Sequence, residues 1–296
     1  MGDSSLINLG ELSKPATVLI EKVSDAVGGI FKPYQIVRVA KAEAEAELIK
    51  AESQIQTSDL MKRAFYRFLE EESKRQKNIE NITQQALPHL EEKSQPDKME
   101  DDWITNFFDK CRLISDGEMQ GLWSRVLAGE ANSPGTYSKR TVNFLSGLDK
   151  TDAELFTRLC GFGWIIGNVI PLVYDIQNDI YGKQGLNFGA LSHLDSIGLI
   201  QFDAIAGFQR TKLPKRFSVH YFGEPLHIEM PKDTDNSMNL GHVLLTKTGH
   251  ELYPICGSRP IEGFVDYVRE KWASFKYIKN ESLEQNNSVG VTPEKI

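Results

Sequence analysis

Apolar residues recur at helical spacing in the first stretch of the chain, residues 15–31. The positions that share one side of such a helix are Leu19, Val23, Val27, Ile30 and Phe31. This pattern predicts an amphipathic helix that starts near Pro15 and weakens at Gly28-Gly29. Its polar side mixes acidic and basic residues, whereas helices that lie on membranes are usually rich in Lys and Arg. The pattern therefore favours packing against protein, and a membrane surface stays open as an alternative.

Strong helix formers without proline or glycine fill the next stretch, from Tyr34 to Leu87, and predict one long helix. Its apolar positions form an imperfect stripe: Leu48, Ala51, Ile55, Met61, Phe65, Phe68 and Leu69. Ser58 and Lys62 interrupt a strict heptad, so coiled-coil pairing is compatible with the stripe without being required by it. Residues 87–102, with two prolines, are typical of a linker.

Three shorter helices are expected next. Trp103, Phe107 and Cys111 share one face of the first. The second is expected to begin with a capping box from Ser115 and Glu118. Its apolar positions follow helical spacing: Met119, Leu122, Trp123, Val126 and Leu127. Ser138 is expected to cap the third, which would bury Val142, Leu145 and Leu148.

The pattern changes after a fourth helix, for which Thr151 and Glu154 form a second expected capping box. Residues 164–176 predict two strands that turn at Gly167-Asn168. A helix capped by Asn187 and ended by Gly198 follows, and then a strand from Leu199. Three further strands are expected in residues 216–222, 225–230 and 242–246, before a helix that starts near Thr246 and a last amphipathic helix over 261–275. This order is that of a winged-helix domain.

The fold class predicted is α+β and mainly helical. The expected parts are an amphipathic N-terminal helix (1–33), a long helix with linker (34–98) and a helical domain (99–150). A winged-helix-like domain with a C-terminal helix (151–279) and a disordered polar tail (280–296) complete the chain.

Composition narrows the function classes. The formal net charge of −7 argues against general attraction to phosphate backbones, so nucleic-acid contact would need a local basic patch. Three widely spaced cysteines, Cys111, Cys160 and Cys256, without a CxxC motif, indicate a reducing cytoplasm and no disulfide framework or zinc ribbon. The N-terminus lacks the pattern of a secretory signal, and the longest apolar run is too short and too interrupted for a membrane span. A cytoplasmic location is expected.

Motifs that carry chemistry are missing from the sequence. There is no GxxxxGK[ST], HExxH or GxSxG pattern. His220, His227 and His242 fall in the expected wing but have no metal-ligand spacing. Cys160 and Cys256 lie in apolar stretches, where buried, unreactive thiols are usual. We therefore expect no catalytic residue, metal or cofactor.

Two polar groups remain as candidate sites. The first is a loop cluster without a role in the core: Glu130, Asn132, Lys139 and Arg140. An ion pair between Arg140 and Glu130 is one explanation, and contact with a partner or ligand is the other. The second is a basic segment in the expected wing: Arg210, Lys212, Lys215 and Arg216. A wing of this kind contacts phosphate backbones, but the presumed recognition helix offers only Asn187 for base readout, which disfavours sequence-specific DNA binding.

The stretch "LWSRVLAGEANSPGTYSKRTVNFLSGLDKTDAELF" resembles the signature of an uncharacterised bacterial family of unknown function, and "LTKTGHELYPICGSRP" resembles that family's C-terminal end. The central block is also similar, more distantly, to Abi-alpha proteins, which are associated with abortive infection by phage. That likeness implies phage defence and supplies no catalytic residue.

These observations lead to one expected function and two alternatives. We expect a non-enzymatic bacterial protein that forms a homo-oligomer through its N-terminal helices and binds a protein partner through its C-terminal domain. The alternatives are a nucleic-acid-binding regulator or sensor and a membrane-surface effector.

Overall fold

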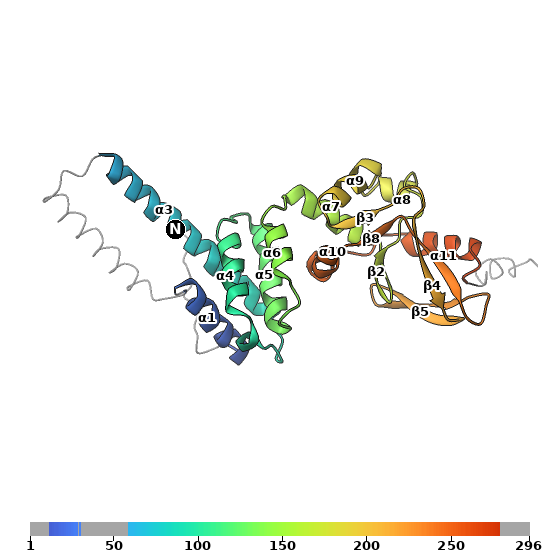
Figure 1. Ribbon diagram of the computed structural model, residues 1–296, viewed down its shortest axis with the longest axis horizontal. Helices are drawn as coiled ribbons and strands as arrows, with labels where there is room; N and C mark the ends of the chain where they lie inside the picture. The colour runs from blue at the N-terminus through green and yellow to red at the C-terminus, as the bar shows by residue number, and fades with distance from the viewer. Residues whose placement is uncertain (1–11, 29, 31–58, 279–296) are drawn as a thin grey trace, which may run out of the picture. The chain divides into compact units, whose positions relative to one another are not determined.

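The computed structural model describes residues 12–28, 30 and 59–278. The chain divides between Leu148 and Asp149 into two compact units, which are described separately (Figure 1). The first unit ends at Leu148, two residues before the boundary expected at residue 150. The expected helical section over 34–58 and the polar tail from residue 280 lie outside the described residues.

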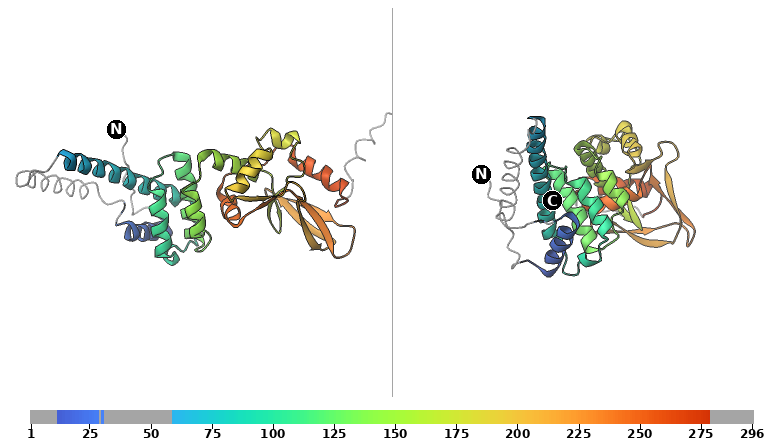
Figure 2. Two further views of the ribbon diagram at one scale, coloured as in Figure 1. Left: turned by 45° about the horizontal axis from the view of Figure 1, so that its top comes forward. Right: turned by 60° about the vertical axis from the view of Figure 1, so that its left-hand side comes forward.

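The N-terminal unit is helical. Its elements are α1 (Lys14–Val27), α3 (Asp59–Ala86), two 3-10 turns, η2 (Leu87–His89) and η3 (Pro96–Lys98), and then α4 (Asp101–Cys111), α5 (Gly117–Asn132) and α6 (Lys139–Leu145). Figures 1 and 2 show α3 extending beyond the helices against which its C-terminal end packs.

Helix α1 confirms the helix predicted near Pro15, and Gly28 ends it with a left-handed backbone (φ 87°). Its apolar side is buried against α4 and η3 through Ala16, Leu19, Ile20 and Val23. The Lys22 ammonium lies 2.8 Å from the Asp101 carboxylate at the start of α4. The apolar side of α1 is therefore covered by the chain itself.

Aromatic side chains form the core of this unit. The Phe107 ring lies between those of Trp103 and Trp123, with centroids 5.1 Å away in both cases. The Trp103 indole N–H donates to the Tyr137 carbonyl at 2.6 Å. The predicted inner faces of α4 and α5 are confirmed, since their apolar positions are buried.

Two predicted helix starts are wrong. Helix α5 is capped by Asp116, whose carboxylate accepts from the N–H groups of Glu118 and Met119 at 3.0 Å, and not by Ser115. A carboxylate at this position also interacts favourably with the helix dipole. Helix α7 (Lys150–Cys160) begins after Asp149, one residue before the expected cap Thr151. The caps predicted at Ser138 and Asn187 are confirmed, and so is the helix start predicted near Thr246, which is the cap of α10.

Most residues of the expected linker, residues 87–102, are exposed, but two of them are buried. Pro96 and Met99 are buried, and the Gln95 N–H donates to the carbonyl of Ala131 near the end of α5 at 2.8 Å. These contacts hold part of the segment against the N-terminal unit.

The C-terminal unit mixes helices with small antiparallel sheets. After α7 come β1 (Gly163–Ile166), β2 (Asn168–Pro171), α8 (Asp179–Gly182), α9 (Phe188–Ser196), β3 (Ile200–Phe202), β4 (Phe208–Leu213), β5 (Arg216–Tyr221), β6 (Glu224–Glu229), β7 (Asn236–Gly241), β8 (Val243–Leu245), α10 (Lys247–Leu252), η4 (Tyr253–Ile255) and α11 (Phe264–Ser274). One sheet has the order β2-β1-β5-β6, and β3-β8 and β4-β7 form two-stranded sheets.

The β1–β2 hairpin turns at Gly167 (φ 76°), as predicted. Strands β4 and β7 were not predicted, because their sequences are polar and lack the alternation typical of a half-buried strand. Their pairing joins residues 23 to 33 positions apart and has two irregularities in register. The predominantly helical α+β class is confirmed. No helix of the described chain combines the length and apolar character needed to cross a bilayer.

Candidate interaction surface on helix α3

The C-terminal half of α3 belongs to the core of the N-terminal unit. Ile79, Ile82 and Ala86 follow the alternating three- and four-residue spacing of one helix face, and all three are buried. They pack chiefly against α5. Burial of these side chains is what anchors α3 to the rest of the unit.

The N-terminal half of α3 carries the same face past the core. Met61, Phe65 and Phe68 continue the spacing of Ile79, Ile82 and Ala86. Met61 is 64% exposed and Phe68 is 56% exposed, and none of residues 59–77 is buried. We call Met61, Phe65 and Phe68 the α3 apolar stripe. Exposed apolar groups in this number on one helix face are typical of a protein-binding surface.

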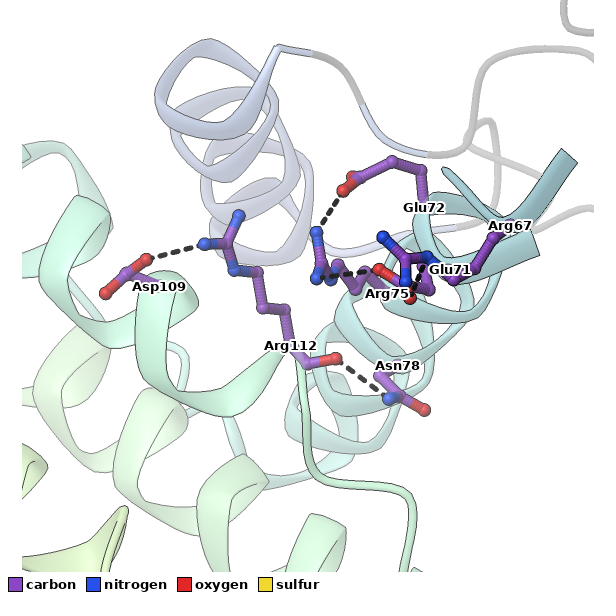
Figure 3. Close-up of polar contacts among 7 residues, drawn as sticks. All are labelled: Arg67, Glu71, Glu72, Arg75, Asn78, Asp109 and Arg112. Carbon is purple, nitrogen blue, oxygen red and sulfur yellow. Dashed lines mark hydrogen bonds and ion pairs between the residues drawn. The ribbon is translucent and has the colours of Figure 1, made fainter. Parts of the chain in front are cut away.

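Two charged residues separate the stripe from the buried half. Glu72 and Arg75 occupy the intervening positions of the same face and form an ion pair (Figure 3). Arg75 also lies 3.5 Å from Glu71, and Glu71 is 3.4 Å from Arg67. These side chains are about 30–75% exposed, so the pairs contribute little to folding stability. Their physical effect is to keep this part of the face hydrated.

Asn78 marks the point at which α3 enters the core. Its side-chain N–H donates to the Arg112 carbonyl at 2.9 Å, and its side-chain oxygen accepts from Gln120 at 3.1 Å. Gln120 donates in turn to the Ile114 carbonyl at 2.8 Å. Asp109 pairs with the Arg112 guanidinium at 2.9 Å beside this network (Figure 3). Sequence analysis missed Asn78 and Gln120, since polar residues on a helix are usually solvated.

Three residues of the predicted loop cluster, Glu130, Asn132 and Lys139, make contacts within the protein. Glu130 is buried, and its carboxylate accepts from the N–H groups of Gly135 at 2.6 Å and Tyr137 at 2.8 Å. The Arg140 side chain is exposed, and these two bonds to the Glu130 carboxylate come from its own loop rather than from Arg140. The loop after α5 turns back on this helix, so the backbone N–H groups of Gly135 and Tyr137 lie within hydrogen-bond distance of the Glu130 carboxylate.

Asn132 and Lys139 also make local contacts. The Asn132 side chain accepts from the Glu91 N–H at 3.0 Å and donates to the His89 carbonyl at 3.0 Å, which ties the end of α5 to the segment after α3. Lys139 lies 3.8 Å from Asp102, and both side chains are solvent-exposed. The loop cluster therefore reads as structural, with Lys139 and Arg140 left at the surface.

The basic segment of the C-terminal unit is largely neutralised by neighbouring groups. Arg216 pairs with Glu229 across the β5–β6 ladder at 2.9 Å, and Lys215 lies 2.7 Å from Asp233. Arg210 donates to the Ile166 carbonyl and covers Gly167. Lys212 is exposed, with a left-handed backbone (φ 59°). The four side chains thus do not present one open cationic surface.

The three histidines of the expected wing serve separate contacts. His227 bonds to Ser218 Oγ at 2.9 Å, and His242 bonds to the Asp203 carbonyl at 2.7 Å, while His220 lies on β5. Within residues 12–28, 30 and 59–278, no three His, Cys, Asp or Glu side chains converge as metal ligands would.

Fold and surface together define an α+β protein with a helical N-terminal unit and an exposed apolar stripe on its longest described helix. The chain belongs to the family described as "Protein of unknown function (DUF2806)", whose profile matches residues 62–269. No curated protein and no solved structure matches the chain. Membership of this family does not identify a biochemical activity. The matched residues include most of α3.

Proposed function

We propose that this protein is a non-enzymatic interaction protein that self-associates through helix α3. The observation that carries the proposal is the α3 apolar stripe, which extends the buried face of the same helix into solvent. Burying such a stripe against a second helix removes apolar surface from water, which stabilises the pair by roughly 25 cal/mol for each Å² buried. A second copy of this chain is the partner that its charges fit best.

Charge pattern selects an antiparallel pair of α3 helices. In a parallel pair, Glu72 would face Glu72 and Arg75 would face Arg75 in successive layers, which is repulsive. In an antiparallel pair centred between Tyr66 and Arg67, Phe65 of each copy faces Phe68 of the other. Lys62 and Arg63 then lie opposite Glu71 and Glu70 of the partner copy.

The C-terminal unit is proposed to be winged-helix-like and to bind a protein partner. In support, α7 packs on α9, β3 follows α9 and pairs with β8, and α10 follows β8. Strands β4 to β7 are inserted between β3 and β8, where a wing would lie. The resemblance of the central block to Abi-alpha proteins extends the proposal to phage defence.

Nucleic-acid binding has less support than protein binding in this scheme. Arg216 and Lys215 face acidic partners, and the side-chain oxygen of Asn187 accepts from the Ala190 N–H at 3.0 Å as the cap of α9. Thus the one side chain expected to read bases already has a structural role. A membrane-surface role loses support too, since α1 buries the apolar side that would enter a bilayer.

Light scattering of the full chain across a concentration series tests self-association. We expect a mass twice the 33.4 kDa of one chain. Phe68→Ser should give a single-chain mass, because it removes one of the two Phe side chains that face each other at the centre of the proposed pair. Leu113→Ser is the matched control: Leu113 is 65% exposed but lies off α3, so this variant should keep the native mass.

Charge reversal tests the orientation. A chain with Glu70, Glu71 and Glu72 changed to Lys should not pair with itself. It should pair with a chain in which Lys62, Arg63 and Arg67 are changed to Glu, and the mixture should regain the mass of two chains. A native chain that stays at 33.4 kDa at every concentration would overturn the proposal.

A further inference from the structure

Three apolar side chains lie at the surface of the C-terminal unit, around the end of β3 and beside α9 (Figure 1). Phe188, the first residue of α9, is 59% exposed, and its ring meets the half-buried ring of Phe202 edge to face, with the centroids 5.5 Å apart. Ile205 is 96% exposed. It follows Phe202 by three residues, so the two Cα atoms lie within about 11 Å of each other. We call Phe188, Phe202 and Ile205 the β3 apolar patch.

The loop that carries Ile205 is held by hydrogen bonds. The Asp203 carboxylate accepts from the backbone N–H groups of Ile205 at 3.0 Å and Ala206 at 2.9 Å. The Asp203 backbone N–H donates to the His242 carbonyl at 3.0 Å, and the His242 Nδ1–H donates to the Asp203 carbonyl at 2.7 Å. The fold therefore fixes the loop with the Ile205 side chain in water, and binding a partner there costs little loop freedom.

A single exposed isoleucine is ordinary on a protein surface. Ile205 differs from that case because a hydrogen-bonded turn supports it and a pair of aromatic rings lies next to it in the chain and on α9. An exposed apolar cluster bordered by polar residues is typical of a protein-binding surface. The β3 apolar patch is therefore a candidate surface for a protein partner.

Two carboxylates border the patch. Asp195 on α9 accepts from the Phe202 N–H at 3.2 Å, and Asp203 accepts from the loop of Ile205. No lysine or arginine within residues 12–28, 30 and 59–278 forms an ion pair with either carboxylate. Each carboxylate has acceptor positions beyond these backbone bonds. The surface therefore fits a partner that carries basic side chains next to its apolar ones.

The backbone of β3 disfavours a partner that adds a strand. Among the described strands, β3 pairs only with β8. The Phe202 N–H serves the other edge of β3, and the Asp195 carboxylate already accepts it. An added strand would need this donor. A segment that presents apolar side chains on one side without strand pairing is an amphipathic helix.

We propose that the β3 apolar patch binds an amphipathic helix of another protein, with Lys or Arg beside its apolar stripe. Ile205 and the two rings contact the stripe, and Asp195 and Asp203 face the basic side chains. This inference rests on the proposed role of the C-terminal unit in binding a protein partner, and it names the surface and the chemistry of that partner.

The test uses a fluorescent synthetic peptide that forms a helix with leucine along one face and lysine elsewhere. Fluorescence anisotropy measures its binding to the native full chain. Ile205→Ser should weaken binding about tenfold or more, because it removes the most exposed apolar side chain of the patch. The variant should unfold at the native temperature, since Ile205 makes little contact with the core. Phe68→Ser, in the α3 apolar stripe, is the control and should bind the peptide as the native chain does.

Asp203→Asn separates charge from shape. The asparagine side-chain oxygen can accept the same two N–H bonds, so the loop keeps its conformation while the surface loses a negative charge. Binding of the lysine peptide should weaken several-fold at low salt, and the loss should shrink as salt is added. A twin peptide with glutamate in place of lysine should not bind.

Equal affinities of the native and Ile205→Ser chains for the lysine peptide would overturn the assignment, and so would tight binding of the glutamate peptide. If Ile205→Ser lowers the mass of the native assembly in light scattering, a second copy covers the patch and the assignment to a foreign helix is wrong. Neither peptide result bears on self-association through α3, which the mass of the Phe68→Ser chain tests separately.

Discussion

The two halves of helix α3 share one spacing of apolar residues and differ in what covers them. Ile79 and Ile82 are buried, while Met61 and Phe68 on the same face are more than half exposed. The comparison teaches that a periodic stripe tells which face of a helix is to be covered but not which molecule covers it. The C-terminal half of this face packs against α5 of the same chain, whereas the N-terminal half is exposed to solvent.

The largest difference between the two halves should appear in the free energy of unfolding when an apolar side chain of the core is shortened to alanine. Ile82→Ala removes a fully buried side chain and should lower the free energy of unfolding by about 2–5 kcal/mol. Met61→Ala on the same face should change it by less than about 0.5 kcal/mol, because Met61 is exposed. Urea unfolding at a concentration too low for association measures both. Equal losses would show that the exposed half also packs within the chain.

A smaller effect should come from the residue at the junction. Asn78→Ala leaves the Arg112 carbonyl and the Gln120 side chain each without one hydrogen bond, and we expect a loss of about 1–3 kcal/mol in the free energy of unfolding. Gln84→Ala, at an exposed position six residues further along α3, is the control. An Asn78→Ala chain as stable as the control would mean that the buried network does not hold α3 in place.

The smallest effect should come from the charged residues between the halves. Arg75→Gln removes the pairs to Glu71 and Glu72, and we expect a loss below about 1 kcal/mol that shrinks with added salt. Thermal unfolding at low and high salt measures it. A loss that is large and independent of salt would show that these side chains are part of the core rather than a hydrated divide.

Much of the helical half of the protein could be predicted because its signals are local. Ser138 and Asn187 cap their helices as expected, α10 starts near Thr246 as expected, and the inner faces of α4 and α5 follow from spacing alone. Local signals also misled. Asp116 caps α5 beside the Ser115 that fits a capping box, since either oxygen can serve and only the path of the chain decides.

The strands and the candidate sites needed long-range contacts that a pattern does not contain. Strands β4 and β7 are polar, and the pairing of β3 with β8 joins residues more than forty positions apart. An ion pair with Arg140 was one of two explanations offered for Glu130, whereas two backbone N–H groups of its own loop donate to this carboxylate.

The sequence by itself determined the helices, most of their caps and the existence of an apolar face along α3, because hydrophobic spacing and capping act over a few residues. Tertiary structure alone decided where that face stops being core and which polar side chains are already satisfied. Those outcomes depend on contacts between residues far apart in the chain, whose free energy appears only when the segments are brought together.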